Sequence, residues 1–139
     1  MALVAPTRRR KARLFARHYE STIHGKEAAE GLRYFRTKVG RPLIVMWDRL
    51  GVHGAKEVKA LVAAHPKDYV LEKLPSYAPD LNPEEGCNSQ AKAELRDAVP
   101  VDVPDLHRKT RCAFLHVGRH PASLRGYFLH AGLSLRGLT

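Results

Sequence analysis

The chain has 139 residues, 44% of them hydrophobic and 27% charged, so it is long enough for one buried core and too apolar for a disordered segment. No apolar run approaches the roughly 20 residues of a membrane span, and two cysteines are too few for a disulfide scaffold or a zinc cluster. Lys and Arg outnumber Asp and Glu by 24 to 14, and the net charge of +10 favours a polyanionic partner such as nucleic acid, although a solvated basic surface gives the same charge. We therefore expect a cytoplasmic, nucleoid-associated protein with reduced thiols and no membrane partner.

The N-terminal segment predicts an antiparallel pair of strands. Leu3 and Val4 form a short apolar strand, and residues 11–19 alternate between two sides as a strand does. The densest basic cluster of the chain lies at the turn between them and comprises Arg8, Arg9, Arg10, Lys11 and Arg13. On a hairpin turn these side chains are suited to bind DNA phosphates. The alternative is that these basic side chains are only solvated and bind no partner.

A helix and a buried strand are predicted next. Residues 26–39 place apolar side chains on one helical face, and Gly40 and Pro42 end that helix. The run from Pro42 to Trp47 contains no polar residue, which is typical of a strand that is buried on both faces of its sheet. Asp48 follows this strand directly, and the carboxyl ends of strands are where sites form in open α/β sheets.

The remaining sequence continues the alternation of helices and strands. We expect a helix over residues 55–65, a strand over 69–74 and a proline-rich loop over 75–83. A further helix begins at Pro83, carries Glu84 and Glu85 in its first turn and continues to Ala98. Two more helices, over 104–117 and 121–131, form a helical C-terminal part. This order predicts an α/β fold with a mixed sheet flanked by helices.

Two carboxylates stand at junctions where catalysis is possible. Asp48 ends a strand, and Glu85 begins a helix after a loop that its prolines stiffen. Together they are suited to hold Mg²⁺, which prefers oxygen ligands and supports phosphodiester chemistry. Each residue also has a purely structural interpretation. Asp48 alone could cap the next turn, and Glu85 alone could be an ordinary acid in the first turn of a helix. His53 could contact a phosphate or orient a neighbouring group. It could equally be a residue at the start of a helix.

Two segments resemble the catalytic core of the DDE transposases of mariner-like elements and bacterial insertion sequences. Residues 42–53, Pro-Leu-Ile-Val-Met-Trp-Asp-Arg-Leu-Gly-Val-His, resemble the strand that bears the second catalytic Asp, here Asp48. Residues 74–85, Leu-Pro-Ser-Tyr-Ala-Pro-Asp-Leu-Asn-Pro-Glu-Glu, resemble the motif of the third carboxylate and match it to Glu85 rather than Glu84. The 36 residues between Asp48 and Glu85 are close to the spacing usual in that family.

The resemblance implies a ribonuclease-H-like fold in which Asp48 and Glu85 are both catalytic residues and metal ligands. It implies Mg²⁺ as cofactor, with Mn²⁺ as a substitute, and cleavage and strand transfer of DNA at transposon ends. Terminal repeats and target duplex are then the partners. We also expect Arg49 and His53, close to Asp48 in sequence, to contact DNA.

The chain departs from the family pattern at its beginning. The family's first catalytic Asp lies on a strand upstream of the hairpin, and this chain has no acidic residue before Glu20. We therefore expect residues 1–133 to be a partial catalytic domain that lacks the first strand, and residues 134–139 to be a flexible tail. Strand transfer by the chain alone should be impaired, and self-association or pairing with an upstream transposase fragment is expected.

Two other functions stay open. The first is a non-catalytic basic DNA-binding module that acts as a partner or inhibitor of a full-length transposase. The second is an unrelated magnesium nuclease of the same fold class. Salt-dependent DNA binding that survives replacement of Asp48 and Glu85 would indicate the first, and the choice of substrate distinguishes the second.

Overall fold

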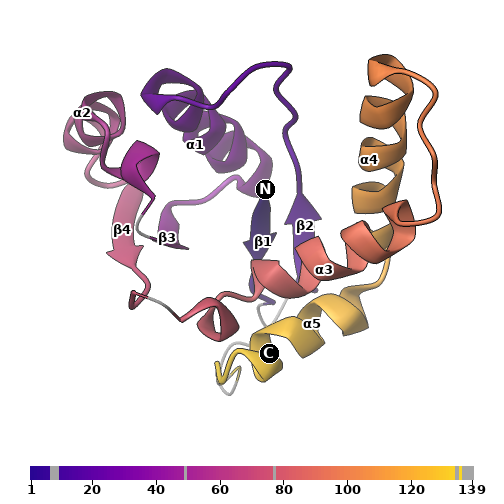
Figure 1. Ribbon diagram of the computed structural model, residues 1–139. Coiled ribbons are helices and arrows are strands. Elements are labelled where there is room, and N and C mark those ends of the chain that lie inside the picture. The colour runs from indigo at the N-terminus through magenta and orange to yellow at the C-terminus, as the bar shows by residue number, and fades with distance from the viewer. Residues whose placement is uncertain (7–9, 49, 77, 134, 136–139) are drawn as a thin grey trace. The chain divides into compact units, whose positions relative to one another are not determined.

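A computed structural model describes residues 1–6, 10–48, 50–76, 78–133 and 135. These residues form a mixed α/β structure that, as far as it is described, contains five α-helices and four strands (Figure 1). The chain divides into two compact units, a central unit of residues 19–78 and a terminal unit that combines residues 1–18 with residues 79–139. Within the described residues, no helix combines the length and the apolar character needed to cross a bilayer.

The central unit is a pair of parallel strands with two helices. Its elements are α1 (Gly25–Val39), β3 (Leu43–Trp47), the short 3-10 helix η1 (Gly51–Gly54), α2 (Lys56–Ala64) and β4 (Tyr69–Lys73). The strands pair in register from Leu43 opposite Tyr69 to Trp47 opposite Lys73. Because the strands are parallel, both carboxyl ends lie at the same edge, and Asp48 follows β3 there.

Helix α1 begins and ends as its sequence predicts. The backbone N–H of His24 donates to Glu27 Oε2 at 3.0 Å, which places an acid in the first turn, where the helix dipole favours it. Gly40 ends the helix in the left-handed conformation, with φ at 72°, and its N–H donates to the Arg36 carbonyl oxygen. The guanidinium of Arg36 also donates twice to Asp68 Oδ1, at 2.9 and 2.7 Å, and so connects α1 to the start of β4.

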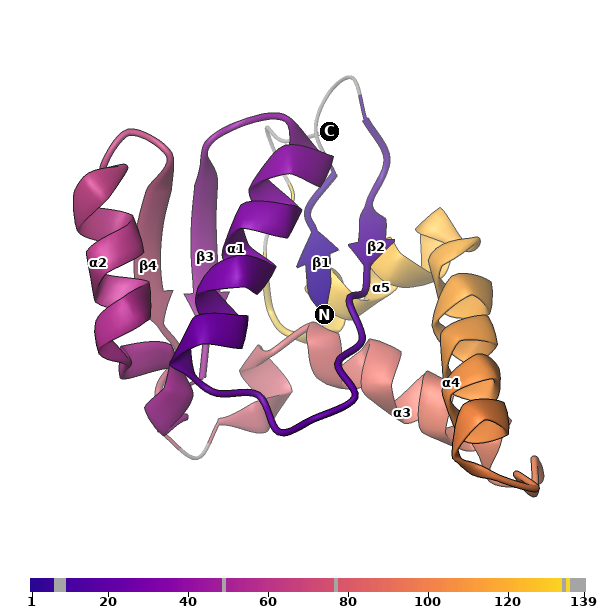
Figure 2. The same cartoon turned by 90° about the horizontal axis from the view of Figure 1, so that it is seen from above.

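Among the described residues of the central unit, only one face of the β3–β4 pair is covered. Leu43, Val45 and Trp47 pack against the core of this unit, which consists of Ala29, Leu32, Val58, Leu61 and Tyr69. The alternate residues Ile44 and Met46 are 75% and 51% exposed. The prediction that this strand is buried on both faces is therefore wrong, because α1 and α2 both lie on the same side of the strand pair (Figure 2).

The terminal unit is an antiparallel strand pair with three helices. Its elements are β1 (Ala2–Val4), β2 (Arg13–Phe15), the short 3-10 helix η2 (Pro79–Leu81), α3 (Glu84–Leu95), α4 (Val103–Gly118) and α5 (Pro121–His130). The strand predicted over residues 11–19 is only three residues long, because β1 offers three ladder partners, from Ala2 opposite Phe15 to Val4 opposite Arg13. The predicted helix from Pro83 begins at Glu84 and ends at Leu95, before Ala98.

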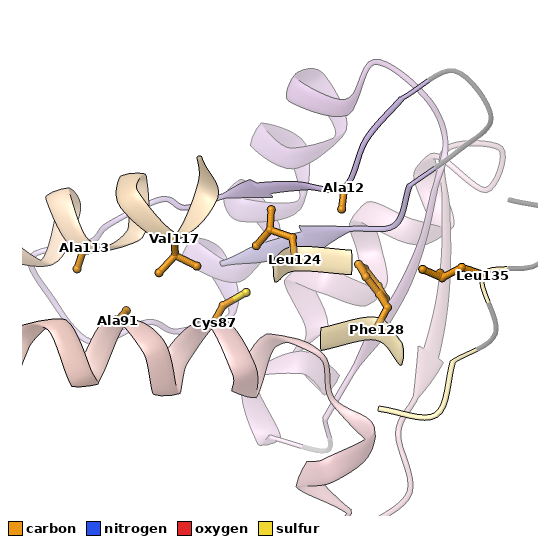
Figure 3. Packing of buried hydrophobic residues seen from close by; sticks show 8 residues of the cluster. All are labelled: Ala12, Cys87, Ala91, Ala113, Val117, Leu124, Phe128 and Leu135. Carbon is orange, nitrogen blue, oxygen red and sulfur yellow. The ribbon is translucent and has the colours of Figure 1, made fainter. Parts of the chain in front are cut away.

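The core of the terminal unit lies between its three helices and β2. Eight buried residues form it: Ala12, Cys87, Ala91, Ala113, Val117, Leu124, Phe128 and Leu135 (Figure 3). Burial, with the nearby charge of Glu84, raises the pKa of the Cys87 thiol to about 12, so this thiol is a packing group. Leu135, which lies in the predicted tail, is buried in this core, whereas Ser134 and residues 136–139 fall outside the described residues.

Candidate metal centre and nucleic-acid surface

Asp48 is held by its own loop while part of its carboxylate stays open. Its Oδ1 accepts a hydrogen bond from the Leu50 backbone N–H at 3.2 Å and lies 2.9 Å from His53 Nδ1. The bond to Leu50 is the turn cap that the sequence leaves open as an alternative. The side chain is nevertheless 49% exposed, and Oδ2 has no partner among the described residues. Capping the turn therefore does not exclude a ligand at Oδ2.

The ring of His53 is fixed on two sides. It stacks on Trp47 with ring centroids 4.2 Å apart and planes 5° from parallel. Its Nδ1 faces two acceptors of Asp48, the carboxylate Oδ1 at 2.9 Å and the carbonyl oxygen at 3.2 Å. Because both neighbours are acceptors, Nδ1 carries the proton, and in the neutral ring Nε2 is the acceptor. His53 therefore orients Asp48 from within the same loop.

The two glutamates at the start of α3 have different surroundings. The backbone N–H of Glu84 donates to Asn82 Oδ1 at 3.1 Å, and that of Glu85 donates to the Asn82 carbonyl oxygen at 3.1 Å. Glu84 is half-buried, and its Oε1 accepts from the Leu3 backbone N–H of β1 at 3.2 Å. Glu85 is exposed, and its carboxylate has no partner in the part of the chain that the structure describes. Glu84 is thus a structural acid, whereas Glu85 is open to a ligand.

A tyrosine from α5 fixes the first turn of α3. A Cβ atom at Gly86 would lie inside the van der Waals radius of the Tyr127 ring, so only glycine allows this approach. The Tyr127 hydroxyl also donates to Gln90 Oε1, one turn further along α3. The turn that carries Glu85 therefore rests on α5. The sequence pattern gave no signal of this contact, which joins residues distant in the chain.

The residues predicted to bind DNA are placed only in part. Arg8, Arg9 and Arg49 lie outside the described residues. Arg10 and Lys11 are exposed. Arg13 is half-buried: its guanidinium lies 5.0 Å from the centre of the Phe15 ring, and its Nε is buried without a hydrogen-bond partner among the described residues. The role of these side chains in DNA binding therefore remains a prediction.

The family model for DDE superfamily endonucleases matches residues 1–107. The chain belongs to the DDE superfamily endonucleases. The match spans both strand pairs, Asp48 and the start of α3, so it confirms the family that the two sequence motifs indicate. No curated protein and no solved structure matches the chain. Most of α4 and all of α5 lie beyond the matched residues.

Members of this superfamily are nucleases that act on DNA and generally use divalent metal ions. The donor types of this endonuclease domain fit such an ion, because Asp48 and Glu85 each offer carboxylate oxygen that no described residue engages. Asp48 belongs to the central unit and Glu85 to the terminal unit. Among the described residues, no three His, Cys, Asp or Glu side chains gather as a ready metal cluster.

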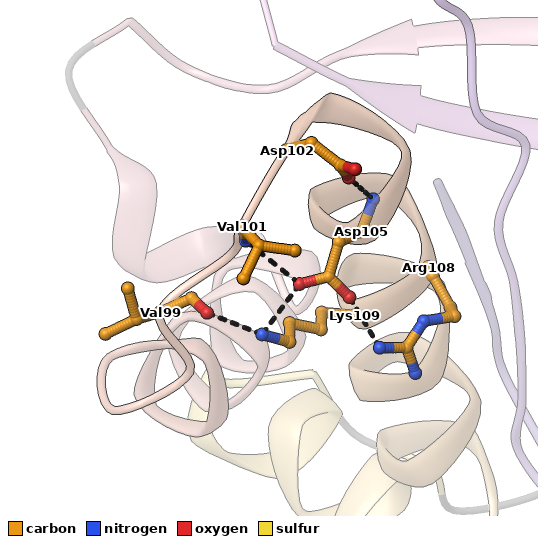
Figure 4. A network of polar contacts seen from close by, with 6 residues as sticks. All are labelled: Val99, Val101, Asp102, Asp105, Arg108 and Lys109. Carbon is orange, nitrogen blue, oxygen red and sulfur yellow. Dashed lines mark hydrogen bonds and ion pairs between the residues drawn. The ribbon is translucent and has the colours of Figure 1, made fainter.

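Helix α4 pairs some of its basic side chains with an acid and leaves others without one among the described residues. Its N-cap Asp102 accepts from the Asp105 N–H at 2.7 Å, and Asp105 accepts from the Val101 N–H at 3.2 Å (Figure 4). The same Asp105 carboxylate pairs with Arg108 at 2.5 Å and with Lys109 at 2.8 Å. The hydrogen bond from Lys109, followed by those from Val101 and Arg108, lowers the pKa of Asp105 to about 2.

Proposed function

We propose that this endonuclease domain binds a divalent cation through Asp48 and Glu85 and acts in the cleavage and joining of DNA at transposon ends. The family match over residues 1–107 carries the proposal, because it includes both carboxylates in the elements where the motifs predict them. The open Oδ2 of Asp48 and the exposed Glu85 support it. Mg²⁺ is the proposed ion, with Mn²⁺ as a substitute, because both carboxylates are hard oxygen ligands.

Each side chain has a distinct role in this proposal. When bound, a divalent cation activates a water or a 3′-hydroxyl and stabilises the leaving oxygen during phosphodiester cleavage. Asp48 and Glu85 hold the cation, and His53 keeps Asp48 oriented through its Nδ1–H. Glu84 stays on the Leu3 N–H and does not take part. The basic surface attracts the substrate, because the chain carries a net charge of +10.

The finer fold assignment belongs to the same proposal. We assign residues 1–133 to a catalytic domain of ribonuclease-H-like type with a mixed sheet. The antiparallel pairing of the first two strands and the parallel pairing of the other two support this assignment, because a mixed sheet contains both kinds. Terminal repeats and target duplex are the proposed partners.

A DNA-binding module without catalysis is the second candidate. One observation favours it: the net charge of +10 suits a polyanionic partner whether or not a metal ion is bound. Such a module would bind duplex DNA through its cations and would act as a partner or inhibitor of a complete transposase. Its binding would fall steeply with salt and would not depend on Asp48 or Glu85.

Nicking of supercoiled DNA distinguishes the two candidates. The purified chain, Asp48→Asn and Glu85→Gln are each incubated with Mg²⁺, with Mn²⁺ and with a chelator. Glu84→Gln is the matched control, because it removes the same charge from the adjacent residue and leaves an oxygen that accepts the Leu3 N–H. The proposal predicts weak metal-dependent nicking, in keeping with the impaired activity expected of this chain, that is lost in Asp48→Asn and Glu85→Gln and kept in Glu84→Gln. DNA binding without nicking in any variant would indicate the non-catalytic module.

A further inference from the structure

A histidine that follows β2 lies over helix α4. The ring of His18 contacts the ring of Phe114, with centroids 6.0 Å apart and planes tilted by 50°. His18 itself is exposed, whereas Phe114 is half-buried and packs against the core of the terminal unit. The contact therefore holds a titratable ring at the surface of the helix, at a defined position.

Two basic residues of α4 share the face on which His18 rests. His107, Arg111 and Phe114 are spaced by four and three residues, so they follow one another along one side of the helix. His107 and Arg111 are both exposed. Neither forms an ion pair with an acid in the described part of the chain, whereas the neighbouring Arg108 and Lys109 are held by Asp105. The helix thus has a neutralised side and an uncompensated side.

The electrostatics of His18 reflect this uncompensated charge. Partial desolvation of the ring lowers the pKa of His18 below its usual 6.5, and interactions with Arg111, the chain's amino terminus and His107 lower it further. Every charged group that shifts this pKa is a cation. Like charges that gather at a surface without a carboxylate repel one another, and a bound anion relieves that repulsion.

We infer that His18, His107 and Arg111 form a binding site for the phosphodiester backbone of duplex DNA. An exposed guanidinium presents several donors to phosphate oxygens, and two imidazole rings beside it extend the contact along the helix. A rise of about 6 Å between residues four apart separates His107 and Arg111 along the helix axis. The site reads no sequence, because its groups contact phosphates rather than base edges. The inference rests on the proposed function, in which DNA is the substrate.

Binding of labelled duplex DNA over a range of salt concentrations tests this site. The wild-type chain is compared with Arg111→Gln and His107→Gln. Arg108→Gln is the matched control, because it removes an exposed arginine from the same helix whose charge Asp105 already compensates. Arg111→Gln should weaken binding about fivefold, the upper range for an exposed ion pair. It should also reduce the slope of log Kd against log salt by about 0.9, equally for unrelated duplex sequences. Thermal unfolding of each variant verifies that the fold is retained.

The outcomes separate the site from the proposed function. A larger loss for Arg111→Gln than for Arg108→Gln, with His107→Gln between them, supports the site. Equal losses for both arginine variants would overturn it, because binding would then follow net charge alone. Failure of the wild-type chain to bind duplex DNA would overturn both the site and the proposed function. Retained binding without metal-dependent nicking would remove only the catalytic proposal.

Discussion

His53 Nδ1 lies 2.9 Å from Asp48 Oδ1 while the His53 ring stacks on Trp47, so one imidazole connects a candidate metal ligand to the last residue of β3. The stack on Trp47 fixes the plane of the His53 ring, and the hydrogen bond from Nδ1–H orients the Asp48 carboxylate. A loop residue is thereby fixed by an apolar contact on one side and a polar contact on the other. This arrangement makes His53 a positioning residue for Asp48.

Replacing His53 with alanine should change the surroundings of Trp47 and loosen Asp48. Trp47 is the only tryptophan of the chain, so its fluorescence reports this site alone. We expect its emission to shift to longer wavelength as water replaces the ring, and Mn²⁺ affinity to fall about tenfold. His65→Ala, at an exposed histidine after α2, should change neither. Unaltered emission in His53→Ala would show that the stack is absent.

The approach of Tyr127 to Gly86 should make α3 sensitive to one methyl group. Gly86→Ala places a Cβ atom against the Tyr127 ring, and we expect a loss of about 1–3 kcal/mol in the free energy of unfolding. Urea unfolding of the two single variants and of the double variant Gly86→Ala with Tyr127→Ala measures their coupling. The double variant should lose less than the sum of the single losses. Additive losses would mean that the two residues do not touch.

Because β3 is packed on one side only, a substitution on its covered side and one on its exposed side should differ in their effect on the free energy of unfolding. Val58→Ala removes methyl groups from a fully buried position of α2 and should cost about 2 kcal/mol. Ile44→Thr changes a side chain that is 75% exposed and should cost less than about 0.5 kcal/mol. Chemical denaturation measures both. A large loss for Ile44→Thr would show that another surface covers this face of the strands.

The acid network at the start of α4 should weaken in strong acid. The folded state lowers the pKa of Asp105 from 3.8 to about 2, so the stabilisation is complete above pH 3.8 and is lost as the pH falls towards 2. Far-UV circular dichroism during acid titration should show helix loss in this window. In Asp105→Asn the same part of the titration should be flatter. An identical acid transition in both proteins would show that Asp105 does not contribute.

The sequence was sufficient for the elements with strong local signals. The apolar spacing, Gly40 and Pro42 predicted α1, and Pro83 with two following acids predicted the start of α3. The motif around Asp48 and Glu85 predicted the family, which the match over residues 1–107 confirms. Each of these signals depends on residues close together in the chain.

Features that depend on distant residues could not be read in the same way. The apolar run of β3 does not reveal that both helices lie on one side and leave Ile44 exposed. Alternation in residues 11–19 does not reveal that β1 offers only three partners. Nothing near Gly86 in the sequence indicates Tyr127, and nothing near His18 indicates Phe114. The uncompensated charge of Arg111 did leave a local signal, because no acid lies three or four residues from it.

Calorimetric titration with Mn²⁺ tests the central claim most directly, because it asks whether Asp48 and Glu85 hold the same ion. The wild-type chain should bind the ion, and Asp48→Asn and Glu85→Gln should each abolish most of that binding. Glu84→Gln should bind as the wild type does, because Glu84 is engaged by Leu3. Equal Mn²⁺ affinity in the wild type, Asp48→Asn and Glu85→Gln would contradict the account.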